Sequence, residues 1–322
     1  MNANIGAMHY IVTGGAGFIG SNLVRELQRR HADTWVTVVD DFSSGDWRNL
    51  DGLRGDVVAR PCEELDWGAA FTGLKVDGIY HLASITDTTV TDQRLMLERN
   101  VESMRRILIF AHQQGCPVTY ASSAATYGLV EGAAVEDQPP SPANVYGFSK
   151  MVLDNLGRRA ASYGQTVAGV RYFNVYGPGE AHKGKMASMA YQLYLQMAEG
   201  RRPRIFEDGQ QRRDFVYVRD VVAGTIAAME SGRSGIWNLG SGQARSFNEL
   251  VILLNKSLGT RLDPDYIENP YVGAYQDFTL ADLKRAGEDI GYVPEWQLER
   301  GIDHYMQLLQ GREARIESGA VR

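Results

Sequence analysis

The chain has 322 residues, of which 44% are hydrophobic and 22% charged, and its formal net charge is −6. This composition is typical of a globular protein with one large domain or two unequal ones, and the lack of excess cations argues against a nucleic acid or a membrane surface as a partner. The two cysteines, Cys62 and Cys116, fit neither a metal site nor a disulfide framework, so we expect no metal. Residues 1–7 lack the basic and apolar stretches of a secretion signal, and we expect a soluble, cytoplasmic protein.

Short strand-like runs alternate with helical stretches through the first half of the chain. Strands are expected at residues 10–13, 34–39, 78–82, 118–121 and 167–171, and helices at 19–30, 96–114 and 149–163. Such alternation is typical of βαβ units in a parallel sheet. We therefore predict an α/β fold of Rossmann type, with a doubly wound parallel sheet, over residues 1–173.

The pattern becomes less regular after residue 171. A turn at Gly177 and Pro178 precedes a helix expected at 187–199. Strand-like runs at 215–218 and 236–239 are expected to return to the main sheet. We therefore predict a smaller mixed α/β C-terminal substrate domain from residues 174–212 and 242–322, with 213–241 returning to the first domain.

The first expected strand runs into a glycine-rich turn, Thr13-Gly14-Gly15-Ala16-Gly17-Phe18-Ile19-Gly20. In a dinucleotide-binding turn, Gly14 makes the tight turn, Gly17 lets a pyrophosphate approach the backbone and Gly20 lets helix and strand pack closely. Glycines alone are a weak signal, but the second expected strand is followed by Asp40, 20 residues after Gly20. A carboxylate there can accept hydrogen bonds from the adenosine ribose, so the turn predicts a dinucleotide site.

The residues after the second strand favour NAD over NADP. Asp40 and Asp41 would repel a ribose 2′-phosphate, and no cation follows before Arg48. Arg48 keeps NADP open as the alternative.

Tyr146 and Lys150 stand four residues apart at the start of an expected helix, so their side chains share one face. A neighbouring ammonium favours loss of the phenol proton, which makes Tyr146 a candidate acid/base for a hydroxyl oxidised by nicotinamide. This spacing is common on solvated helix faces, so it indicates a catalytic site only together with other features of the sequence. One is Ser123, at a strand end rich in small hydroxyl residues, where it can hydrogen-bond the reacting oxygen.

Together these features resemble the extended short-chain dehydrogenase/reductases, the class of NAD-dependent epimerases and dehydratases. The resemblance spans nearly the whole chain and includes RYFNVYGP at 171–178, RDFVYV at 213–218 and NLGSG at 238–242. A narrower resemblance, carried by ASSAATYG at 121–128, HKGKMAS at 182–188 and YQDFT at 275–279, is to the ADP-glyceromanno-heptose 6-epimerases. It implies inversion of C6 of a nucleotide sugar through a transient ketone, and a homo-oligomer.

The resemblance also implies roles for individual residues. Lys183 would be a second acid/base, on the face of the ketone opposite Tyr146, although it otherwise reads as a surface lysine of a glycine-rich loop. Arg213 would bind the pyrophosphate of the substrate. The implied dinucleotide contacts are Gly14, Gly15, Gly17, Phe18, Ile19, Gly20, Asp40, Asp41, Leu82, Ala83, Ser84, Asn100, Tyr146, Lys150 and Val175. The implied substrate contacts are Ser123, Asn174, Lys185, Phe206, Glu207, Arg213 and Tyr275.

Other functions remain open. A UDP-sugar 4-epimerase shares the core motifs, and a non-catalytic dinucleotide sensor could use the same fold. A 4,6-dehydratase is disfavoured, because Ser123-Ala124-Ala125 stands where those enzymes typically carry Thr-Asp-Glu. The sequence departs from the usual heptose-epimerase pattern at Trp47, at Lys185 and in the loop at 85–92.

Overall fold

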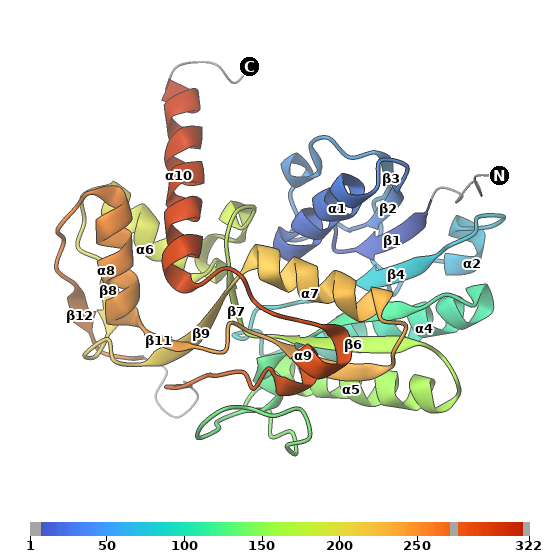
Figure 1. Cartoon of the computed structure of the whole chain (residues 1–322). Helices are drawn as coiled ribbons and strands as arrows, with labels where there is room; N and C mark the ends of the chain where they lie inside the picture. The colour runs from blue at the N-terminus through green and yellow to red at the C-terminus, as the bar shows by residue number, and fades with distance from the viewer. Residues whose placement is uncertain (1–7, 271–275, 318–322) are drawn as a thin grey trace.

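The computed structural model describes residues 8–270 and 276–317, and its larger layer is a parallel sheet between helices (Figure 1). Within these residues the sheet has seven strands in the order β10-β6-β5-β4-β1-β2-β3, all paired in parallel. The strands are β1 His9–Thr13, β2 Trp35–Val39, β3 Gly55–Val58, β4 Gly78–His81, β5 Val118–Ser123, β6 Val167–Tyr172 and β10 Gly235–Leu239. The predicted doubly wound α/β fold is confirmed, with β3 as an edge strand that the pattern did not predict.

Helices cover both faces of this sheet because successive strand residues point to opposite sides. In β1, Ile11 packs in a core with Ile107 of α4, whereas Val12 packs in a core with Leu23 of α1 and Ile226 of α7. Figure 1 shows α7 on one side of the sheet and α4 and α5 on the other. The helices of this layer are α1 Phe18–Arg30, α2 Trp67–Ala70, α3 Gln93–Leu97, α4 Ser103–Gln114, α5 Val145–Ser162 and α7 Val218–Glu230.

The helix expected at 96–114 contains a wider turn. A π-helical segment, Glu98–Glu102, connects α3 to α4, and such turns occur often at functional sites. It carries Asn100, whose fully buried amide accepts a hydrogen bond from the backbone N of Ile85 at 2.8 Å and donates to Ser149 Oγ at 3.0 Å. The wide turn thereby ties the loop after β4 to α5.

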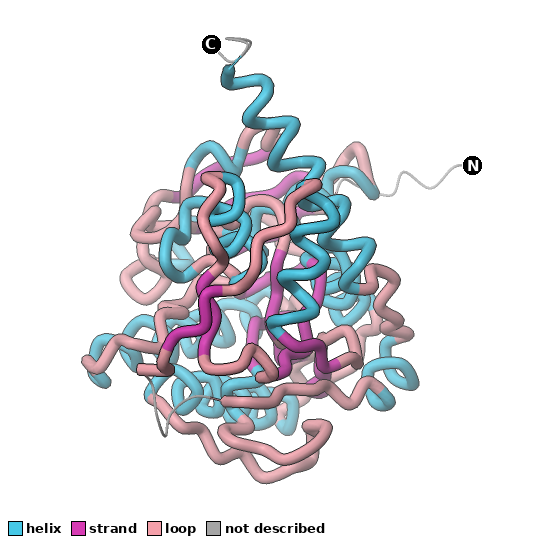
Figure 2. The backbone as a smooth tube through the Cα atoms, turned by 90° about the vertical axis from the view of Figure 1, so that its left-hand side faces the viewer, coloured by secondary structure: helices cyan, strands magenta, loops and turns pink. Residues whose placement is uncertain are grey.

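A smaller mixed α/β part lies beside the large sheet (Figures 1 and 2). In the described ranges it holds a three-stranded sheet, β11-β9-β7, and a strand pair, β12-β8. Its core includes Leu193 of α6, Leu250 of α8 and Ile302 of α10. The remaining elements of the chain are β7 Asn174–Tyr176, β8 Arg204–Phe206, β9 Arg212–Tyr217, β11 Ala244–Ser246, β12 Asp265–Ile267, α6 Met189–Ala198, α8 Phe247–Leu258, α9 Lys284–Ile290 and α10 Leu298–Glu317.

The strand expected at 215–218 requires a correction. It does not join the main sheet, because β9 pairs with β7 and β11 instead. Phe215 and Tyr217 face the core of the smaller part, whereas the strand expected at 236–239 does extend the main sheet beside β6. An apolar run indicates a buried strand but does not identify its partner. The division of the chain into two domains stays a prediction.

The register brings the carboxyl ends of the central strands to one edge of the sheet. Thr13 of β1 is level with Val39 of β2 and His81 of β4, and Ser123 of β5 is level with Tyr172 of β6. The loops that follow these strands therefore meet at that edge, where open α/β sheets bind their ligands. Among the described helices, none is both long enough and apolar enough to cross a bilayer.

Candidate active site

A cavity of about 1190 Å³ opens at this edge and is lined by residues of both parts of the fold. Its wall runs from the glycine turn after β1, past Tyr146 of α5, to Arg213 of β9 and Phe247 of α8. Cavities for one small ligand usually measure roughly 300–1,000 Å³. This cavity is large enough for a dinucleotide and a second ligand side by side.

The glycine turn has the geometry that a dinucleotide requires. Gly14 has φ +67°, and a Cβ there would lie 2.7 Å from the backbone N of Ala83. A Cβ on Gly20 would lie 2.1 Å from the carbonyl oxygen of Gly14, so only glycine lets α1 start this close to β1. Gly17 precedes the first residue of α1 and lines the cavity. A helix N-terminus favours an anion, so these residues fit a pyrophosphate.

Asp40 lies at the end of β2 with its carboxylate held by the backbone. Oδ2 accepts a hydrogen bond from the N of Ala16 and Oδ1 accepts one from the N of Phe42, both at 2.9 Å. Burial raises the pKa of Asp40, and the two backbone hydrogen bonds act in the opposite direction. Arg48, the cation that left NADP open, is exposed and pairs with Asp46 at 2.6 Å. The site therefore presents carboxylates, rather than a free cation from this turn, to the adenosine ribose.

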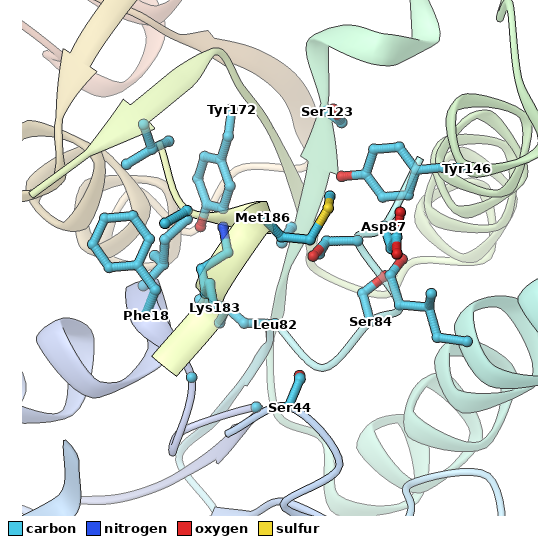
Figure 3. A pocket seen from close by; sticks show the side chains of 18 of the residues that line it. Phe18, Ser44, Leu82, Ser84, Asp87, Ser123, Tyr146, Tyr172, Lys183 and Met186 are labelled. Carbon is cyan, nitrogen blue, oxygen red and sulfur yellow. The ribbon is translucent and has the colours of Figure 1, made fainter. Parts of the chain in front are cut away.

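Tyr146 and Lys150 lie in the first turns of α5, which begins after Asn144, a residue whose side chain accepts a backbone hydrogen bond there. The ammonium of Lys150 is buried, donates to the carbonyl oxygen of Ala121 at 2.8 Å and lies 5.7 Å from the centre of the Tyr146 ring. Figure 3 shows the Tyr146 hydroxyl pointing into the cavity near Ser123. The phenol, the amine and the hydroxyl predicted from the sequence therefore meet at one place.

Burial is the main influence on the protonation of this pair. It raises the pKa of Tyr146, an effect that the Ser123 hydroxyl opposes. It lowers the pKa of Lys150 to about 7, an effect that Asp154 opposes. The expected lowering of the phenol pKa by Lys150 is thus not the leading effect, because burial penalises the charged form of both groups. Lys150 changes its charge near neutral pH, beside the phenol.

We expect Lys150→Met to stabilise the protein at low pH. The folded state holds Lys150 with a pKa of about 7 instead of its ordinary value of 10.5. Between these values the unfolded chain binds more protons, so the free energy of unfolding of the unmodified protein rises by up to about 1.4 kcal/mol per pH unit. The advantage of the variant is therefore largest below pH 7 and shrinks as the pH rises. Urea unfolding of both proteins at about pH 6 and about pH 9 measures this, and a pH-independent difference would contradict it.

Lys183 approaches the cavity from the side opposite Tyr146. It lies in a 3₁₀-helical segment, Ala181–Met186, and its ammonium is 5.6 Å from the centre of the Phe18 ring. Burial lowers the pKa of this ammonium. Figure 3 shows Lys183 and Tyr146 on opposite sides of the cavity, with Met186 between them in that view. Two groups that exchange protons thus flank the same space.

A buried carboxylate holds the segment that carries Lys183. Glu180 accepts hydrogen bonds from the N of Gly177 at 3.1 Å, from the N of Ser188 at 2.5 Å and from Ser188 Oγ at 2.8 Å. It also acts to raise the pKa of Lys183, against the effect of burial. These bonds join the two ends of the segment and hold the backbone around Lys183.

Arg213 and Asn174 line the cavity on the side of the smaller part. Arg213 is buried, and its guanidinium lies 5.8 Å from the centre of the Phe247 ring. Asn174 Oδ1 accepts a hydrogen bond from Thr279 Oγ1 at 2.9 Å. A guanidinium in a cavity wall suits a pyrophosphate, which it can bind by charge-assisted hydrogen bonds. Tyr275, predicted for the same end, lies outside the described residues.

The structure brings most of the predicted site residues to the cavity wall. Those on the wall are Gly14, Gly17, Phe18, Ile19, Gly20, Asp40, Asp41, Leu82, Ala83, Ser84, Ser123, Tyr146, Lys150, Asn174, Val175, Lys183, Phe206 and Arg213. Of the described residues, Gly15, Asn100, Lys185 and Glu207 lie off the wall. Lys185 and Glu207 are exposed, and Asn100 acts on the cavity only through the loop that it anchors.

Several wall residues were not predicted from the sequence. His182 and Met186 flank Lys183, and Thr86 and Asp87 lie in the loop after β4. The sequence feature that could have identified these four residues is their position in loops next to predicted site residues. Loops at the carboxyl ends of parallel strands surround the ligand. Arg99 and Glu63, which pair at 2.5 Å, line the cavity but lie far apart in the sequence and carried no pattern.

The chain resembles a known family and several solved structures over most of its length. The model of the NAD dependent epimerase/dehydratase family matches residues 10–240. The chain is similar to ADP-L-glycero-D-manno-heptose-6-epimerase of Helicobacter pylori, with 37% identity and a TM-score of 0.88 over 96% of this chain and 98% of that one. It is also similar to UDP-glucose 4-epimerase of Thermotoga maritima, with 28% identity and a TM-score of 0.88 over 95% and 100%. For UDP-glucuronic acid 4-epimerase of Bacillus cereus the values are 25% and 0.85 over 95% and 100%.

Proposed function

The chain belongs to the NAD-dependent epimerase/dehydratase family and is a nucleotide-sugar epimerase, and from this premise we propose that it inverts C6 of an ADP-glycero-manno-heptose. The 37% identity with the H. pylori heptose epimerase, over nearly the full length of both chains, supports this choice of sugar. The observation that carries the reaction type is the placement of Tyr146 and Lys183 on opposite sides of one cavity (Figure 3). An inversion through a ketone needs a proton-transfer group on each face of the carbonyl.

NAD is the cofactor that the site residues fit, with Gly14, Gly17 and Gly20 around the pyrophosphate and Asp40 at the ribose. When bound, NAD supplies a reversible hydride acceptor. The amine of Lys150 donates a hydrogen bond to the carbonyl oxygen of Ala121 and lies beside the phenol. Its pKa of about 7 lets it gain or lose a proton near neutral pH.

We assign the steps at the reacting oxygen to three side chains, Tyr146, Ser123 and Lys183. Tyr146 takes the proton of the sugar hydroxyl while the carbon gives up its hydride, and Ser123 holds the oxygen that becomes a carbonyl. After the ketone has rotated to present its other face, that face receives the same hydride and the ketone oxygen takes a proton from Lys183. Proton exchange with water restores both groups for the next turnover. Arg213 and Asn174 hold the diphosphate end and keep the nucleotide in place while the sugar turns.

Incubation of the purified protein with ADP-heptose and with UDP-glucose, separately and without added cofactor, tests this function. We expect NMR spectra to show the C6 epimer of the heptose and no release of reduced cofactor, because the hydride returns within each turnover. Interconversion of the UDP sugar alone would make the protein a UDP-sugar 4-epimerase. Stoichiometric formation of NADH would make it a dehydrogenase.

A further inference from the structure

The loop after β4 places a carboxylate at the reaction end of the cavity. Asp87 lines the wall together with Ser84 and Thr86. Figure 3 shows Asp87 close to Tyr146 and Ser84, across the view from Lys183. With the sugar beside Tyr146, as the proposed function has it, Asp87 lies at the sugar end of the cavity.

The carboxylate of Asp87 is held in a fixed orientation with one oxygen free. Oδ1 accepts hydrogen bonds from the N and the Oγ1 of Thr89, at 2.8 and 2.6 Å. In the described part of the chain no hydrogen bond reaches Oδ2. The loop is anchored where Asn100 bonds both backbone groups of Ile85. The carboxylate is half-buried, so a ligand can reach Oδ2.

The charge of Asp87 is not neutralised by a neighbour. Among the described residues it takes part in no ion pair. The cations at this end have other surroundings: Lys150 donates to the carbonyl oxygen of Ala121, and Lys183 lies against the ring of Phe18. A bound sugar therefore meets a carboxylate that has no ion-pair partner among the described residues.

We propose that Asp87 is a specificity residue, which accepts a hydrogen bond from a sugar hydroxyl and rejects sugars that carry a carboxylate. The proposed function places the sugar beside Tyr146, and the assignment rests on it. A hydroxyl bonded to a carboxylate forms a strong, charge-assisted hydrogen bond, whereas two carboxylates at short range repel each other. Such a repulsive group gives selectivity by disfavouring the wrong substrate. The fold alone does not decide this choice, since a uronate epimerase and a glucose epimerase share it.

The matched ligands ADP-glucose and ADP-glucuronic acid, together with the UDP pair, test the assignment. The two members of each pair differ only at C6, which carries a hydroxymethyl group in one and a carboxylate in the other, so the ratio of the two Kd values cancels the preference for the base. For the NAD-loaded protein we expect the neutral sugar to bind at least about 10-fold more tightly, and Asp87→Asn to reduce this preference by about 10-fold. Asp87→Glu, which keeps the charge, should retain it.

The matched control is Asp33→Asn, which removes an exposed carboxylate in the turn before β2, away from the cavity wall, and should leave the ratio unchanged. An equal ratio in Asp87→Asn and the unmodified protein, or no preference in the unmodified protein, overturns the assignment. The outcome is separable from the proposed reaction, because binding is measured without turnover. If the protein does not invert ADP-heptose, but Asp87→Asn still removes the preference for the neutral sugar, the proposed substrate is wrong and the assignment of Asp87 as a specificity residue stands.

Discussion

Tyr146→Phe is expected to lower kcat for epimerisation by about 10²–10⁴-fold, the usual contribution of a positioned acid/base. The phenylalanine ring keeps the shape of the cavity wall, so the Kd of the nucleotide sugar should stay within about threefold. The physical reason is the loss of the phenol that points into the cavity near Ser123 (Figure 3). The drop should appear in kcat and not in binding.

Progress curves followed by NMR give kcat, and calorimetry gives the Kd of the sugar nucleotide. The matched control is Tyr163→Phe, because Tyr163 is exposed at the far end of α5. It should keep the kcat of the unmodified protein. If Tyr146→Phe turned over at the normal rate, the phenol would not be the acid/base and the non-catalytic sensor would become the better reading.

Lys183→Met should abolish inversion to a similar degree, by about 10²–10⁴-fold. Methionine retains an apolar side chain against the ring of Phe18, so the segment closed by Glu180 is expected to keep its shape. Without Lys183 the ketone lacks a proton donor on its second face. Oxidation at the first face, which uses Tyr146, remains available.

Single-turnover absorbance at the wavelength of reduced nicotinamide separates these steps. We expect Lys183→Met to show the reduced cofactor transiently and to form little inverted product. Lys256→Met, a change of an exposed lysine on α8, is the control and should behave like the unmodified protein. Normal inversion by Lys183→Met would remove Lys183 from the reaction and leave Tyr146 acting alone.

The dinucleotide site was predictable from the sequence because its signals are local. Gly14, Gly17, Gly20 and Asp40 occupy fixed positions around one βαβ unit, in which Gly20 lies against Gly14 and Asp40 accepts a hydrogen bond from the backbone of Ala16. The pairing of Tyr146 with Lys150 was predictable for the same reason, since both lie on one face of one helix.

Long-range features were less predictable. The partner of β9 depends on packing against α6, α8 and α10, which an apolar pattern does not encode. The pKa of Lys150 depends on burial, which the spacing to Tyr146 does not reveal. Asp87 is a single carboxylate in a polar loop, and only the fold shows that it reaches the reaction end of the cavity.

A substrate labelled with deuterium at C6 tests most directly whether inversion proceeds through a transient ketone. The account predicts that the inverted heptose keeps its deuterium in full when the reaction is run in ordinary water, because the same hydride leaves and returns. Washout of the label into the solvent, with inversion at the normal rate, would contradict it and indicate removal of that hydrogen as a proton.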